Sequence, residues 1–181
     1  MRADSAESAR TFENMAKLLD ICVFPDPVLR APTEKVADFG PSFQSFLEDL
    51  WNTMYLRDGV GLAAPQVGVS RKVTVVDAQG QKFVLANPEI LEREGEAVAE
   101  EGCLSFPGIF VPVLRPTRIR LRYQNEQGEP VEREAVDFLA RVFSHEIDHL
   151  NGRLLIDHVS PLRRQFIQRK LKKAASEADL S

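Results

Sequence analysis

Residues 145–149 constrain this chain more than any other stretch, because they read His-Glu-Ile-Asp-His. Apolar residues recur around them at helical spacing, so the sequence predicts a helix over residues 136–150. In a helix, His145 and His149 project from one face a turn apart, where two imidazoles can hold one metal ion. Glu146 follows the first histidine and would serve as a general base beside that ion. The fold is therefore expected to be organised around this helix.

The same pattern also fits an ordinary amphipathic helix with solvated histidines. Against this interpretation, the chain has three histidines and only His158 lies outside the pair. A catalytic metal site needs a third protein ligand and keeps a fourth position for water. Cys103 is a candidate, although its own segment is explained more simply by a small buried filler. Asp157 and His158 are downstream candidates, as a zinc endopeptidase would require.

Size and composition indicate one globular domain without a DNA or membrane partner, although a local basic patch remains compatible with them. The chain has 181 residues, and its 23 basic and 27 acidic residues give a net charge of −4. This balance argues against a surface covered by nucleic acid, so no DNA partner is expected. The sequence has no apolar run of about 18 residues and no secretory signal, so no membrane span is expected. Two cysteines are too few for a disulfide framework, which predicts a cytoplasmic location.

The remaining pattern predicts helices and short strands. Residues 40–57 carry apolar side chains at helical spacing and form a predicted helix. Strands are predicted at residues 73–76 and 82–86, ended by Asn87-Pro88, and the acidic residues 89–101 are expected to hold an edge strand. Residues 107–116 are interpreted as an irregular, proline-punctuated bend. Residues 117–123 and 131–136 predict a hairpin with a solvated outer face of arginines.

A last helix is predicted to begin at Ser160-Pro161, a cap residue followed by proline. Its basic side chains could meet RNA phosphates, or they could form a solvated face. Earlier in the chain, residues 59–68 consist mostly of small side chains, which let another backbone approach closely. Gln66 is the only hydrogen-bonding side chain in that stretch. It is either a turn glutamine in solvent or an amide donor at the edge of a cleft.

Three separated stretches together resemble the peptide deformylase family. They are Gly59-Val60-Gly61-Leu62-Ala63-Ala64-Pro65-Gln66, Glu101-Gly102-Cys103-Leu104-Ser105 and His145-Glu146-Ile147-Asp148-His149. The similarity begins at about Leu18, which leaves residues 1–17 as an N-terminal extension and residues 18–181 as one catalytic domain. The resemblance implies an α+β fold with antiparallel β-sheets around a central metal-binding helix, and a C-terminal helix. It implies a metal-dependent hydrolase that removes the formyl group from the N-terminal formylmethionine of newly synthesised polypeptides, releasing formate.

The resemblance also implies the roles of individual residues. Cys103, His145 and His149 would bind Fe²⁺, with Zn²⁺, Ni²⁺ or Co²⁺ as substitutes. Glu146 would be the acid and base, and Gln66 with the backbone N–H of Leu104 would bind the formyl oxygen. The substrate backbone would pair along Val60, Gly61 and Leu62. The methionine pocket would be lined by Val60, Phe138, Val142 and the ring of His145.

Several positions give further expectations. Ser144 and Phe110 depart from the family pattern. Ser144 is expected to cause no loss of activity. Phe110 is expected to change which substrate residues are preferred after the methionine. Asp148 is expected to lie near Arg115. The basic terminal helix suggests a ribosome contact, and a non-enzymatic module that docks there is the other class of function. Formate release from a formylated peptide separates that class from an enzyme.

Overall fold

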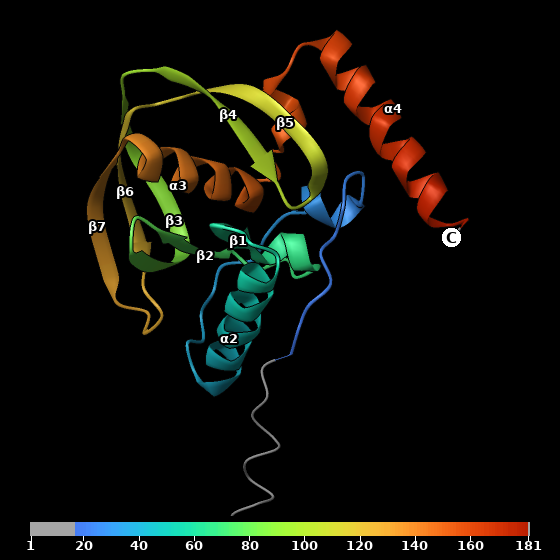
Figure 1. Cartoon of the computed structure of the whole chain (residues 1–181). Coiled ribbons are helices and arrows are strands. Elements are labelled where there is room, and N and C mark those ends of the chain that lie inside the picture. Colours follow the sequence, from blue (N-terminus) through green and yellow to red (C-terminus); the bar gives the residue numbers. More distant parts are fainter. Residues whose placement is uncertain (1–16, 181) are drawn as a thin grey trace, which may run out of the picture.

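Helix α3 (Asp137–Leu150) runs through the centre of the molecule, with strands on both sides of it (Figure 1). The structure is a computed structural model that describes residues 17–180. One sheet has five strands in the order β1-β2-β3-β6-β7, and a second sheet pairs β4 with β5. All of these pairings are antiparallel. The predicted α+β class with antiparallel sheets is confirmed, while the N-terminal extension lies outside the described residues except for Lys17.

The five-stranded sheet contains the strands expected from the sequence and one more. Its members are β1 (Gly61–Ala63), β2 (Val73–Ala78), β3 (Gln81–Glu94), β6 (Arg118–Gln124) and β7 (Pro130–Val136). The hairpin of β6 and β7 confirms the prediction for residues 117–123 and 131–136. β1 lies at one edge of this sheet, because it pairs only with β2. That edge is where a further strand could add.

Asn87 and Pro88 were expected to end a strand, and this prediction is wrong because β3 continues through them. Asn87 has a φ of 52°, and the pairing with β6 shifts register between Ala86 and Glu89. The Asn87 side chain accepts a hydrogen bond from Val36 N–H at 2.8 Å and donates to the Val36 carbonyl at 2.9 Å. A bulge held in this way bends a strand without ending it. The acidic segment 89–101 is consequently divided between β3 and β4.

The hairpin of β4 (Ala97–Cys103) and β5 (Phe106–Arg115) replaces the irregular bend predicted for residues 107–116. That prediction is wrong because Ile109, Val111 and Val113 are buried with a period of two between exposed neighbours. The prolines in this segment favoured a bend in the sequence analysis, although the alternation of apolar residues indicates a strand. In a two-stranded sheet each strand has an open edge, where a residue such as Pro112 is tolerated.

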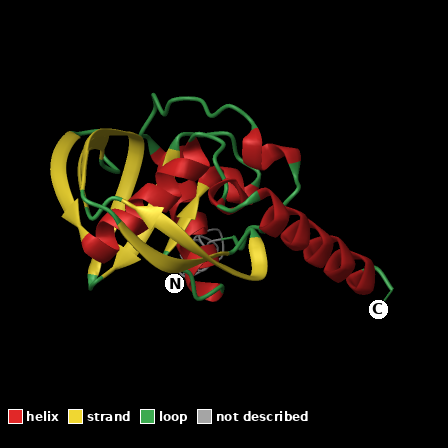
Figure 2. Cartoon of the chain, turned by 90° about the horizontal axis from the view of Figure 1, so that it is seen from above, coloured by secondary structure: helices red, strands yellow, loops and turns green. Residues whose placement is uncertain are grey.

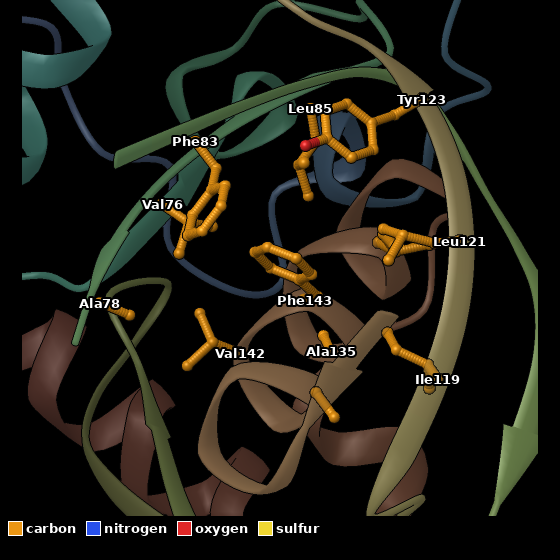
Figure 3. Packing of buried hydrophobic residues seen from close by; sticks show 12 residues of the cluster. Val76, Ala78, Phe83, Leu85, Ile119, Leu121, Tyr123, Ala135, Val142 and Phe143 are labelled. Carbon is orange, nitrogen blue, oxygen red and sulfur yellow. The ribbon is translucent and has the colours of Figure 1, made fainter. Parts of the chain in front are cut away.

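Phe143 fixes the orientation of α3 against the five-stranded sheet. It is fully buried, and its ring meets Phe83 edge to face with centroids 5.1 Å apart. Figure 3 shows Phe143 among side chains from several strands, including Val76, Leu85 and Leu121. With this side of α3 held by the sheet, the adjacent side of the helix faces the β4–β5 hairpin.

Two further helices complete the fold. α2 (Pro41–Leu56) confirms the helix predicted for residues 40–57 and packs through its buried side on the sheet. α4 (Pro161–Ala178) confirms the terminal helix, and the Ser160 hydroxyl accepts the Arg163 N–H at its start. α4 packs on the rest of the molecule through its buried residues Ile167 and Leu171, and its C-terminal end projects outward (Figure 2). No helix in residues 17–180 is long and apolar enough to cross a membrane.

The outward arginines of β6 form ion pairs with glutamates on both neighbouring strands. Arg118 pairs with Glu94 and Glu134, and Arg120 pairs with Glu92 and Glu132. Arg122 lies 3.0 Å from Glu89 on β3. These charges neutralise one another, which supports the predicted solvated face.

Candidate metal centre

Three side chains from two elements converge beside α3. Cys103 ends β4, and His145 and His149 lie on α3. Their potential ligand atoms all lie within 4.8 Å of one another, and Cys103 Sγ is 3.3 Å from His149 Nε2. Around a tetrahedral zinc-like ion with bonds of about 2.0–2.3 Å, neighbouring ligand atoms are about 3.5 Å apart. The three residues therefore fit a single divalent cation.

The ionisation of Cys103 and the orientation of the two histidine rings also suit a cation. Burial acts to raise the pKa of the Cys103 thiol, but interactions with His149 and His145 lower it to about 5. Cys103 is then a thiolate at neutral pH, which is the form that binds metals. His145 Nδ1 lies 2.9 Å from Glu101 Oε2, which leaves its Nε2 for a cation. His149 Nδ1 is buried without a hydrogen-bond partner among the described residues, and its Nε2 faces the sulfur.

Glu101 is a part of the site to which the sequence pattern assigned no role. Its carboxylate accepts hydrogen bonds from Arg115 at 2.9 and 3.0 Å, from Arg141 at 2.8 Å, and contacts His145. Burial acts to raise the pKa of Glu101, but the bonds from His145 and Arg115 lower it well below the usual range. The signal that could have identified it is the two-residue spacing to Cys103, which puts both side chains on one face of β4.

The expected contact between Asp148 and Arg115 is present, with Arg115 Nη1 2.6 Å from Asp148 Oδ2. The same oxygen lies 2.8 Å from His158 Nε2. Asp157 forms a paired salt bridge with Arg30, with two distances of 2.9 Å. Neither Asp157 nor His158 belongs to the cysteine–histidine group. The ligand arrangement of an endopeptidase, with a third ligand downstream of α3, is therefore not supported.

Glu146 is buried next to the two histidines, with an exposed fraction of 4%. Its Oε2 lies 3.3 Å from the Thr74 hydroxyl, whose oxygen is also 2.9 Å from the Leu62 carbonyl. Burial is the main cause that raises the pKa of Glu146 above its ordinary value. On the other side, a Cβ added to Gly61 would lie 2.5 Å from Glu146 Oε1. Gly61 therefore makes room for this carboxylate, a role that the sequence pattern did not indicate.

Gln66 is buried, with an exposed fraction of 2%, so the interpretation as a solvated turn residue is wrong. It lies in the 3₁₀ turn η2 (Ala64–Val67), where its Oε1 accepts the Ala63 N–H at 3.0 Å. Its Nε2 donates toward Ser105 Oγ at 3.2 Å and Cys103 Sγ at 3.5 Å. The amide donor is thus fixed beside the candidate ligands, and Ser105 is a second residue that the sequence reasoning missed.

A cleft of about 460 Å³ opens over this group. The predicted substrate residues Val60, Gly61, Phe138 and Val142 line it, together with Gln66, Cys103, Leu104, His145 and Glu146. The side chain of Leu62 does not, because it is fully buried in the core beneath α2. Only its backbone, in edge strand β1, remains available for the predicted role. Phe110, with 61% of its surface exposed, also lines the cleft.

Two histidines spaced for a metal, a thiolate and a buried glutamate beside a cleft define a metal-dependent hydrolase. The polypeptide deformylase family model matches residues 18–165. The peptide deformylase of Thermotoga maritima is 51% identical over 152 residues, which are 83% of this chain and 93% of that protein. A crystal structure of a peptide deformylase from Legionella pneumophila has 39% identity and a TM-score of 0.86, covering 91% of this chain and 99% of that one.

A crystal structure of the peptide deformylase from Ehrlichia chaffeensis in complex with actinonin is also similar. It has 34% identity and a TM-score of 0.83, and it covers 87% of this chain and 98% of that one. The chain belongs to the peptide deformylase family. These enzymes remove the N-formyl group from nascent peptides and depend on a metal. The alternative function, a binding module without enzymatic activity, is therefore not supported.

Gly61→Ala is expected to lower kcat by roughly 10²-fold, because the added methyl group pushes the Glu146 carboxylate out of position. Gly61 does not have a positive φ, so its backbone conformation allows alanine and the expected effect comes from the contact with Glu146. Gly80→Ala is the control: its φ of 75° makes alanine strained, but its Cβ would meet no atom within 4 Å. We expect Gly80→Ala to lose stability and keep kcat, as measured by thermal unfolding and formate release. Equal kcat for Gly61→Ala and the unchanged protein would refute this role.

Proposed function

We propose that Cys103, His145 and His149 hold one Fe²⁺ ion, and that Glu146 carries the proton during deformylation. The convergence of one sulfur and two imidazoles beside a buried carboxylate is the observation on which this proposal rests. When bound, such an ion polarises the formyl carbonyl and makes water acidic enough to supply hydroxide near neutral pH. We also propose that residues 18–181 act as a single catalytic domain.

The substrate peptide adds to the open edge of β1, where residues 60–62 offer their backbone groups. Its methionine side chain enters the apolar side of the cleft. Phe138 and Val142 are one helical turn apart on α3, and both line the cleft with Val60. These side chains exclude water and hold the formyl group over the candidate ligands.

Glu146 moves the proton. Its Oε2 faces the Thr74 hydroxyl, so Oε1 is the oxygen free to take the proton of the attacking water. The water oxygen bonds to the formyl carbon. Glu146 then gives the proton to the amide nitrogen, the C–N bond breaks, and formate and a free N-terminal amine leave. Its burial favours the protonated form that this second transfer needs.

Gln66 and the backbone N–H of Leu104 stabilise the negative oxygen that develops on the formyl carbon. The Gln66 amide is held by Ala63 and Ser105, so it needs no reorientation during the reaction. Its remaining N–H is directed toward Cys103 Sγ and thus toward the reacting group. A fixed donor of this kind typically lowers the barrier by about 3 kcal/mol.

Iron is proposed because it is the family's working metal, and the test is sensitivity to air. The protein loaded with Fe²⁺ without oxygen should release formate from formyl-Met-Ala-Ser rapidly, then lose activity on aeration as iron and thiolate oxidise. The Zn²⁺ form should be slower and stable in air. Full activity after long aeration, with only zinc bound, would contradict the assignment to iron. No formate release from any metal-loaded form would contradict the proposed function itself.

We further propose that the enzyme works in the cytoplasm and approaches the ribosome through α4. This helix presents a largely exposed basic surface made by Arg163, Arg164, Arg169, Lys170, Lys172 and Lys173. Ribosomal RNA phosphates would attract such a surface, with an affinity that falls as salt rises. Arg163 and Lys170 also donate to the carbonyls of Phe110 and Gly108, which keeps α4 close to the rim of the cleft.

A further inference from the structure

Arg141 lies one turn before His145 on α3 and joins three parts of the molecule. Its Nη1 donates to Glu101 Oε1 at 2.8 Å and to the Val113 carbonyl at 2.9 Å. Its Nη2 donates to the Ala97 carbonyl at 2.7 Å. Ala97 lies on β4 opposite Arg115, and Val113 lies on β5 opposite Ala99, two residues along the same hairpin. One guanidinium therefore ties α3 to both strands of the hairpin that carries Cys103.

Arg141 also supplies one of the four hydrogen bonds that the Glu101 carboxylate accepts. A carboxylate offers about four acceptor positions. Those of Glu101 are taken by Arg115 Nε and Arg141 Nη1 on Oε1, and by Arg115 Nη2 and His145 Nδ1 on Oε2. Without Arg141, Oε1 would lose one of its two donors. The carboxylate that orients His145 would then be held less firmly, by Arg115 and His145 alone.

Arg141 contributes one positive charge to the balance of this group. Glu101 and Asp148 supply two negative charges, and Arg115 lies between them with one positive charge. Arg141 supplies the second positive charge through its contact with Glu101. Its side chain is 12% exposed, so solvent can do little to replace that charge.

We infer that Arg141 is a positioning residue for the metal centre. It holds Glu101 so that His145 keeps one ring orientation, and it holds the hairpin so that Cys103 stays within binding distance of α3. This inference rests on the proposed ligand set of Cys103, His145 and His149. An arginine is required because its planar fork can serve three acceptors at once, whereas a lysine ammonium is a point charge on a flexible stem.

The test is cobalt affinity, measured on the full chain under anaerobic conditions by competition with a chelator. Arg141→Met keeps the apolar stem and removes the fork, and it should weaken Co²⁺ binding by about 10-fold, the lower end of the effect of such outer partners. The Arg141→Lys variant should also bind Co²⁺ more weakly than the unchanged protein. It replaces Arg141→Met in this test if the methionine variant does not fold. The matched control Arg118→Met loses two surface ion pairs and should bind Co²⁺ as tightly as the unchanged protein.

A double-mutant cycle with Glu101 tests whether Arg141 acts through that carboxylate. In a Glu101→Gln background, the effect of Arg141→Met should shrink to about twofold or less. The same 10-fold loss in both backgrounds would overturn the role of Arg141 through Glu101, and cobalt affinity unchanged by either substitution at Arg141 would overturn the whole inference. A thiolate-to-cobalt charge-transfer band that survives Cys103→Ala would instead reject the proposed ligands, so the two failures are distinguishable.

Discussion

Glu146→Gln is expected to lower kcat for formate release by on the order of 10³-fold while the metal stays bound. Glutamine has the same shape as glutamate but cannot accept the proton from water or return it to the amine, and such proton transfers contribute about 10²- to 10⁴-fold. The substituted side chain does not ligate the cation, so metal content should remain one ion per chain. Steady-state formate release and metal analysis of the same sample measure both quantities.

The control for this substitution is Glu134→Gln on the outer face of β7, which changes the same functional group far from the cleft. It should leave kcat within about twofold, since surface substitutions of this kind have small effects. KM for formyl-Met-Ala-Ser should change little in Glu146→Gln, because the methionine pocket is formed by other residues. A Glu146→Gln enzyme with more than a tenth of the original kcat would show that another group carries the proton.

Cys103→Ala is expected to remove both the metal and the activity. The alanine variant keeps the two histidines but leaves only two protein ligands, which are too few for a stable catalytic site. Formate release should fall to background, and dialysis should remove the metal. The control is Cys22→Ala, since Cys22 is the other cysteine and is not part of the ligand group. Tight metal binding by Cys103→Ala would show that the third ligand lies elsewhere.

Much of the centre could be predicted because the helix repeat fixes which residues share a face. The spacing of His145 and His149 was enough to expect a shared ion, and the structure brings Cys103 to them from β4. The buried face of α3 was predictable for the same reason, because Phe143 and Ile147 are four residues apart and therefore lie on one side of the helix. Local periodicity carries information of this kind wherever one face of an element is buried.

Contacts between distant segments could not be predicted in this way. Arg141 and Glu101 are 40 positions apart, and only the folded hairpin puts the guanidinium against the carboxylate. The room that Gly61 gives to Glu146 depends on β1 lying beside α3. The mistakes about residues 87–88 and 107–116 had another cause. Proline and asparagine usually interrupt strands, but here a bulge and an open sheet edge accommodate them.

The most direct measurement is the distance between the bound ion and the sulfur of Cys103, from a crystal structure or X-ray absorption of the metal-loaded protein. We predict one ion per chain, bonded to Cys103 Sγ at about 2.3 Å and to two imidazole nitrogens at about 2.0–2.1 Å. An ion more than about 4 Å from that sulfur, well beyond any such bond, would contradict it.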